Sequence, residues 1–132
     1  MEPTDPAWAE MMQKSTPNTY RALEQLIPAL AAAGHYRGKS FLFGRGAQHK
    51  AAARVEARIK DTLLAMVRDR LIDRYQDAEI CRQRLIAAIR DFASAYQDQD
   101  EAYAVADDYL VTNADYAIQR LREFMTEDKA AD

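Results

Sequence analysis

The last 86 residues of this chain, 47–132, contain neither glycine nor proline. These two residues are the strongest breakers of regular structure, and a sheet would need the turns that they supply. The stretch is instead rich in Ala, Leu, Arg, Glu, Gln and Met, which are all good helix formers. It holds no strand-like alternation of β-branched and aromatic residues between turn signals. We therefore predict an all-α fold.

Two helix starts are marked near the N-terminus. Asp5 followed by Pro6 is typical of an N-cap and a first helical position, which predicts a helix that runs to about Lys14. Residues 15–18, Ser-Thr-Pro-Asn, repeat the same signal. They predict a second helix, and Gly34 is a natural residue for its C-terminal stop.

The rest of the chain carries longer helical patterns. A stripe of apolar residues at every fourth position predicts a helix over about 47–75: Val55, Ile59, Leu63, Val67 and Leu71. Asp77 is a candidate cap for the next helix. Heptad spacing over 103–124 predicts a last helical segment, which Thr112-Asn113 could divide in two. We predict one domain over 1–132, with frayed ends at 1–5 and 128–132, built as an antiparallel bundle of four to six helices.

Charge is distributed unevenly along the chain. The formal net charge is −3, and all four glycines fall within residues 34–46. Residues 34–60 hold seven bases and one acid, a net charge of +6. Residues 97–132 hold ten acids and three bases, a net charge of −7. The modest overall charge is thus a cancellation between a basic zone and an acidic C-terminal part.

The basic zone is the candidate binding site. We predict a glycine-rich basic loop after the second helix, because glycine amides approach anions closely and Arg and Lys supply charge and donors. Lys50, Arg54 and Arg58 continue the loop as a stripe along the next helix, four residues apart. The candidate partner- or anion-binding residues are Arg37, Lys39, Phe41, Phe43, Arg45, His49, Lys50, Arg54 and Arg58.

The sequence shows no assembled catalytic group, so we expect a non-enzymatic helical interaction module without a cofactor or metal. Such a bacterial-type regulator, adaptor or inhibitor would bind another protein, one with an acidic surface. One alternative is nucleic-acid or phosphate-ligand binding through residues 35–60. Another is an all-α metal-dependent hydrolase that uses Glu101, Asp108 and Asp115, which are seven residues apart. A homodimer is also compatible with the sequence.

The single cysteine, the N-terminus and the short apolar segments indicate the cellular compartment. Cys81 cannot form an intramolecular disulfide, and its place in an apolar helical pattern predicts a buried thiol. The N-terminus is acidic where a signal peptide is basic. The longest apolar stretch, 26–33, is interrupted by Pro28 and is far shorter than the ~20 residues that span a bilayer. We therefore expect a cytoplasmic protein that does not enter a membrane.

Overall fold

The fold comes from a computed structural model of the chain. It describes the backbone of residues 5–38, 40–73, 77–93, 104–107, 109–110 and 114–131. Side chains are described for 5–33, 50–73, 77–92, 104–107, 109–110 and 115–126. The described backbone is helical and contains no strand, which confirms the predicted all-α bundle. No helix in these ranges is both long enough and apolar enough to cross a membrane.

The first two helices begin where the sequence predicts. Helix α1 spans Pro6–Ser15, and the Asp5 carboxylate accepts a hydrogen bond from the Ala7 amide at 2.9 Å. Helix α2 spans Pro17–Gly38 and so extends past Gly34, the predicted stop. A glycine inside a helix costs only about 1 kcal/mol, which packing against a neighbouring helix readily offsets. The predicted glycine-rich basic loop falls on residues 34–49, whose side chains lie outside the described ones, so this loop stays a prediction.

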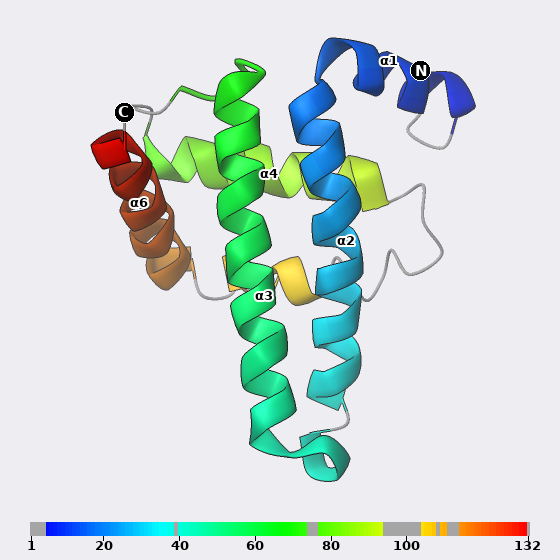
Figure 1. Cartoon of the computed structure of the whole chain (residues 1–132), viewed down its shortest axis with the longest axis vertical. Helices are drawn as coiled ribbons and strands as arrows, with labels where there is room; N and C mark the ends of the chain where they lie inside the picture. Colours follow the sequence, from blue (N-terminus) through cyan, green and yellow to red (C-terminus); the bar gives the residue numbers. More distant parts are fainter. Residues whose placement is uncertain are drawn as a thin grey trace.

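Helices α2 and α3 form an antiparallel hairpin along the long axis of the molecule (Figure 1). Helix α3 spans Ser40–Arg68, so it ends before Tyr75, the predicted end. The stop occurs at Arg70, which adopts a left-handed φ of 60°. The amides of Arg70 and Leu71 then bond back to the carbonyls of Val67 and Met66, at 3.1 and 2.8 Å. These are the hydrogen bonds of a Schellman motif, formed here without a glycine.

The remaining helices cover the hairpin. Helix α4, Ala78–Ala93, lies across one face of α2 and α3, and α6, Ala114–Ala131, lies beside α3 (Figure 1). Asp77 caps α4 as predicted, because its carboxylate accepts a hydrogen bond from the Glu79 amide at 2.8 Å. A short helical stretch at 104–107 precedes α6, while residues 111–113, where the predicted break falls, lie outside the described residues.

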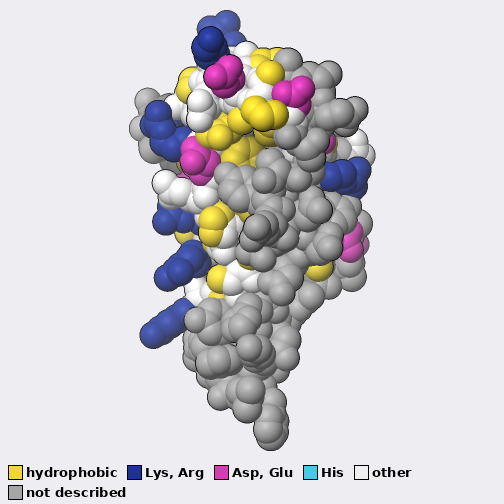
Figure 2. Space-filling view, turned by 90° about the vertical axis from the view of Figure 1, so that its right-hand side faces the viewer, with side chains coloured by type: hydrophobic (Ala, Val, Ile, Leu, Met, Phe, Trp, Pro, Cys, Tyr) yellow, Lys and Arg dark blue, Asp and Glu magenta, His cyan; other side chains and the backbone are white. Residues whose placement is uncertain are grey.

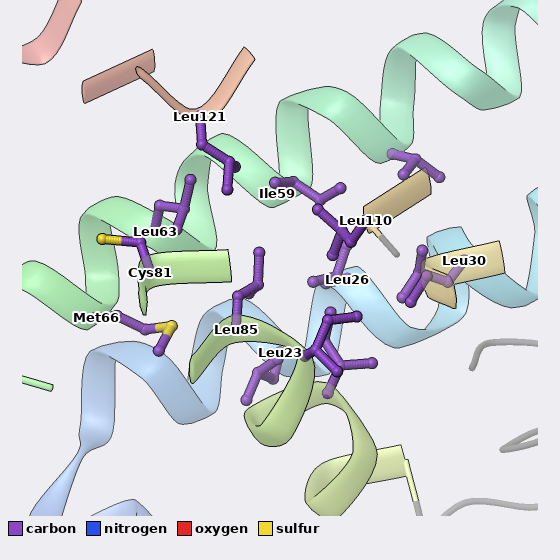
Figure 3. Close-up of a cluster of buried hydrophobic side chains, with 14 of the residues drawn as sticks. Leu23, Leu26, Leu30, Ile59, Leu63, Met66, Cys81, Leu85, Leu110 and Leu121 are labelled. Atoms are coloured by element: carbon purple, nitrogen blue, oxygen red, sulfur yellow. The ribbon is translucent and has the colours of Figure 1, made fainter. Parts of the chain in front are cut away.

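The core lies where α2, α3, α4 and α6 meet (Figure 3). Its fully buried side chains come from all four helices and from the stretch before α6, and they include Leu23, Leu26, Ile59, Leu63, Leu85, Leu110 and Leu121. Cys81 is buried among them, as predicted, and burial raises the pKa of its thiol. At the edge of the core, the rings of Trp8 and Tyr20 contact the Phe92 ring edge-on, at centroid distances of 6.2 and 5.2 Å.

One carboxylate fixes the register of the hairpin. Asp69, just after α3, accepts a hydrogen bond from the Thr19 amide at 2.6 Å and one from the Asn18 side chain at 2.9 Å. Thr19 lies in the first turn of α2, so the negative charge also faces the positive end of the helix dipole. Partial burial raises the pKa of the Asp69 carboxyl, but these hydrogen bonds outweigh burial and leave the pKa below its ordinary value.

Replacement of Asp69 by asparagine tests this contact. We expect Asp69→Asn to lower the free energy of unfolding by about 1 kcal/mol, because it removes a charged cap of α2. Urea unfolding of the variant measures the loss. Asp61→Asn is the matched control, since Asp61 lies on α3 two turns before Asp69, in an exposed ion pair, and should change stability by less than about 0.5 kcal/mol. Equal losses in both variants would contradict a specific role for Asp69.

Candidate functional site

The structure describes the side chains of three of the nine predicted binding residues. Lys50, Arg54 and Arg58 all lie on α3 and occupy successive turns of one helical face. Lys50 and Arg54 are exposed, and the Arg58 side chain is 40% exposed. The predicted stripe therefore lies on the surface of the hairpin. The other candidates have side chains outside the described ones: Arg37, Lys39, Phe41, Phe43, Arg45 and His49.

The stripe continues onto residues that the sequence did not single out. Arg68 lies on the same face of α3 as Arg58, and Arg21 lies across from it on α2. We call the surface formed by Arg21, Lys50, Arg54, Arg58 and Arg68 the basic face. Figure 2 shows a column of Lys and Arg side chains along one edge of the molecule that continues towards its narrow end. The four-residue spacing of Lys50, Arg54 and Arg58 does not reach Arg68, because the next positions at that spacing are Thr62 and Met66.

Most cations of the basic face form no ion pair with the acids that the structure describes. Arg58 is the exception, with a guanidinium nitrogen 3.6 Å from an Asp61 carboxylate oxygen. Arg21, Lys50, Arg54 and Arg68 make no ion pair with any side chain that the structure describes. Unpaired like charges on one surface repel one another and attract anions. Among the described side chains, the basic face is therefore a surface of exposed positive charge.

A groove lies between α2 and α3 on this face. It encloses about 230 Å³, and its wall residues are Asn18, Arg21, Ala22, Gln25, Arg58, Asp61, Leu64, Ala65 and Arg68. Small side chains on both helices leave room for it, since Ala22 faces the hairpin from α2 and Ala65 from α3. The groove is thus lined by apolar side chains together with charged and amide-bearing ones.

The one acid of the basic zone is neutralised elsewhere. Glu56 points to the other side of α3, where its carboxylate accepts a hydrogen bond from the Tyr109 hydroxyl at 2.9 Å and pairs with Arg120 at 3.1 Å. The Tyr116 hydroxyl approaches the same carboxylate at 3.4 Å. Arg120 also bonds Glu123 and lies 4.9 Å over the Phe124 ring.

These contacts set the protonation of the cluster. Partial burial raises the pKa of the Glu56 carboxyl, but the bonds from Arg120 and Tyr109 and the charge of Arg120 outweigh it, and the pKa lies below its ordinary value. Burial and the bond to Glu56 raise the pKa of Tyr109. The cluster therefore holds a carboxylate, a neutral phenol and a guanidinium in a stable arrangement that ties α3 to α6.

The acids proposed for a metal site are only partly described. Asp115 is exposed on α6, whereas Glu101 and Asp108 lie outside the described residues. Among the described side chains, no three His, Cys, Asp or Glu residues gather in a group that could hold a metal ion. The basic face is therefore the site that the described residues delineate best.

Comparisons of the chain with models of known protein families, with characterised proteins and with solved structures gave no match. Function is therefore inferred from the side chains described above.

Proposed function

We propose that this chain is a helical interaction module that binds the acidic surface of another protein through the basic face of the α2–α3 hairpin. One observation carries the proposal: Lys50 and Arg54 extend into solvent on successive turns of α3 and meet no described acid. In a chain with a net charge of −3, acids are available to neutralise such cations. Their separation from the acids favours a role in recognition, because opposed charges steer two partners together.

The composition of the basic face favours a protein over a nucleic acid as its binding partner. Asp61 interrupts the row of cations, and its side chain is 59% exposed. A continuous row of phosphates along α3 would be repelled at that point, and the net charge of −7 over residues 97–132 would repel the rest of a long polyanion. A protein partner can match this mixed pattern residue by residue. Arginines beside half-buried apolar side chains such as Leu64 are also typical of protein interfaces.

The glycine-rich segment extends the same surface in this proposal. Its bases Arg37, Lys39 and Arg45 would add charge, and Phe41 and Phe43 would supply apolar anchors. This part of the proposal rests on the sequence, because those side chains lie outside the described ones.

Quantitative capture of binding proteins tests the proposal. The purified protein is immobilised and exposed to a nuclease-treated lysate of its own source, and the bound proteins are quantified by mass spectrometry. The double variant Lys50→Gln/Arg54→Gln is compared with the matched control Lys14→Gln/Arg122→Gln, which removes the same charge from exposed positions on α1 and α6.

We expect the wild type and the control to retain the same proteins, and the basic-face variant to retain them roughly tenfold less. Equal retention by both double variants would overturn the proposed function. So would binding that survives only without the nuclease step, because the ligand would then be a nucleic acid.

A further inference from the structure

The groove on the basic face has two chemically different ends. Its long direction follows α3 from Arg58 to Arg68, ten residues that correspond to about 15 Å. At the end near Arg58, the ion pair with Asp61 lies beside the Gln25 amide. At the other end, Arg21 and Arg68 line the wall together with Asn18. One end is therefore close to neutral, and the other presents two guanidinium groups to the groove; the Asp69 carboxylate that Asn18 binds is next to this end but is not part of the groove lining.

The hairpin register brings Arg21 and Arg68 together. Asn18 on α2 is bonded to Asp69 at the end of α3, so Arg21, about one turn after Asn18, lies opposite the last turn of α3. Both arginines are exposed, and neither pairs with a described acid. Asp69 lies near this end, where its oxygens accept hydrogen bonds from Asn18 and Thr19, and in the described part of the chain no ion pair joins it to either arginine.

We propose that this groove binds an acidic peptide segment of the partner protein and that Arg21 and Arg68 clamp one of its carboxylates. This inference rests on the proposed function and names the chemistry of the segment that docks. A guanidinium presents its donors in a planar fork that matches a carboxylate, so two of them from facing helices can hold one carboxylate from both sides.

The other groove residues fit the rest of such a segment. Ala22 and Ala65 leave space for the peptide backbone to come close to both helices, and the Gln25 amide can bond to it. The ion pair of Arg58 with Asp61 is exposed and contributes about 1 kcal/mol at most, so it opens at little cost. Arg58 then binds a second acid of the segment.

Fluorescence anisotropy with a fluorescein-labelled peptide of Glu and Ala tests this docking site. The key variant is Arg21→Gln/Arg68→Gln, and its matched control is Lys14→Gln/Arg122→Gln, which removes two charges from exposed positions outside the basic face. We expect the groove variant to weaken peptide binding by roughly tenfold or more and the control by less than about threefold. An equal effect of the two double variants, including no loss in either, would overturn the groove site. The proposed function is tested separately, by the loss of captured partner in Lys50→Gln/Arg54→Gln.

Two further variants separate a clamp from simple charge attraction. Arg21→Lys keeps the charge but removes the fork, and Ala22→Leu fills the groove floor without changing any charge. We expect each to weaken peptide binding by roughly fivefold, with a melting temperature close to that of the wild type. Wild-type affinity in both variants would overturn the groove site, because nonspecific attraction depends on neither fork nor shape.

Discussion

Truncation of Leu63 to alanine is expected to lower the free energy of unfolding by about 3 kcal/mol. Leu63 is fully buried on α3 and lies at the meeting point of α3, α4 and α6 (Figure 3). The substitution removes apolar contacts and leaves a cavity that the surrounding helices can only partly close, since side chains from several helices hold its walls. Urea or thermal unfolding followed by circular dichroism measures the loss.

The neighbouring leucine provides the matched control. Leu64 follows on the same helix but is only half-buried, on the wall of the outer groove. Leu64→Ala changes the same atoms and the same helix propensity, and we expect it to cost less than about 1 kcal/mol. Similar losses for the two leucines would mean that the core does not lie on the side of α3 that faces α4 and α6.

Replacement of Glu56 by glutamine is expected to lower the free energy of unfolding by about 2 kcal/mol at neutral pH. The side chain is 27% exposed and accepts hydrogen bonds from Tyr109 and Arg120, so the loss of its charge leaves Arg120 with one acid, Glu123, in place of two. Chemical unfolding of the wild type and Glu56→Gln gives this difference directly. Asp61→Gln removes an exposed acid from the same helix as a control and should have little effect.

The loss should depend on pH with a defined sign. The pKa of Glu56 is lowered in the folded protein, so the carboxylate stabilises the fold above the ordinary glutamate pKa of about 4.3, and this contribution disappears as the pH falls through the folded value. The stability difference between wild type and Glu56→Gln should therefore be largest near pH 7 and shrink on acidification towards about pH 3. A difference that stays constant over this range would show that the charge of Glu56 is not what ties α3 to α6.

Local signals predicted the class of the fold and several helix starts. Asp5 and Asp77 act as caps because a short acidic side chain reaches the free amides of its own helix, and no distant residue is needed. The end of α3 could not be predicted in the same way. Residues 69–75 contain good helix formers and no glycine, yet Arg70 turns left-handed while Asp69 bonds to α2 and Ile72 is buried in the core. These contacts join residues about fifty positions apart, which a helical periodicity cannot show.

Only part of the candidate site could be predicted, because the rest depends on contacts between residues that are far apart in the sequence. The spacing of Lys50, Arg54 and Arg58 predicted a basic helix face, and their exposure on α3 agrees with it. Arg21 entered the site only through the packing of α2 against α3. Glu56 stood in the sequence among seven bases, but in the fold it faces Arg120, a residue 64 positions away. The acid of this zone therefore does not lie on the basic face, which its place in the sequence could not show.

The most direct test of the basic face is the salt dependence of partner binding. The dissociation constant of the complex with a captured partner protein is measured by calorimetry over a range of salt concentrations, for the wild type and for Lys50→Gln/Arg54→Gln. If the exposed cations of the basic face bind the partner's acids, the wild-type dissociation constant rises steeply with salt, the curve of the variant is flatter, and the two converge at high salt. A wild-type dissociation constant that does not change with salt, or two parallel curves, would contradict recognition through this face.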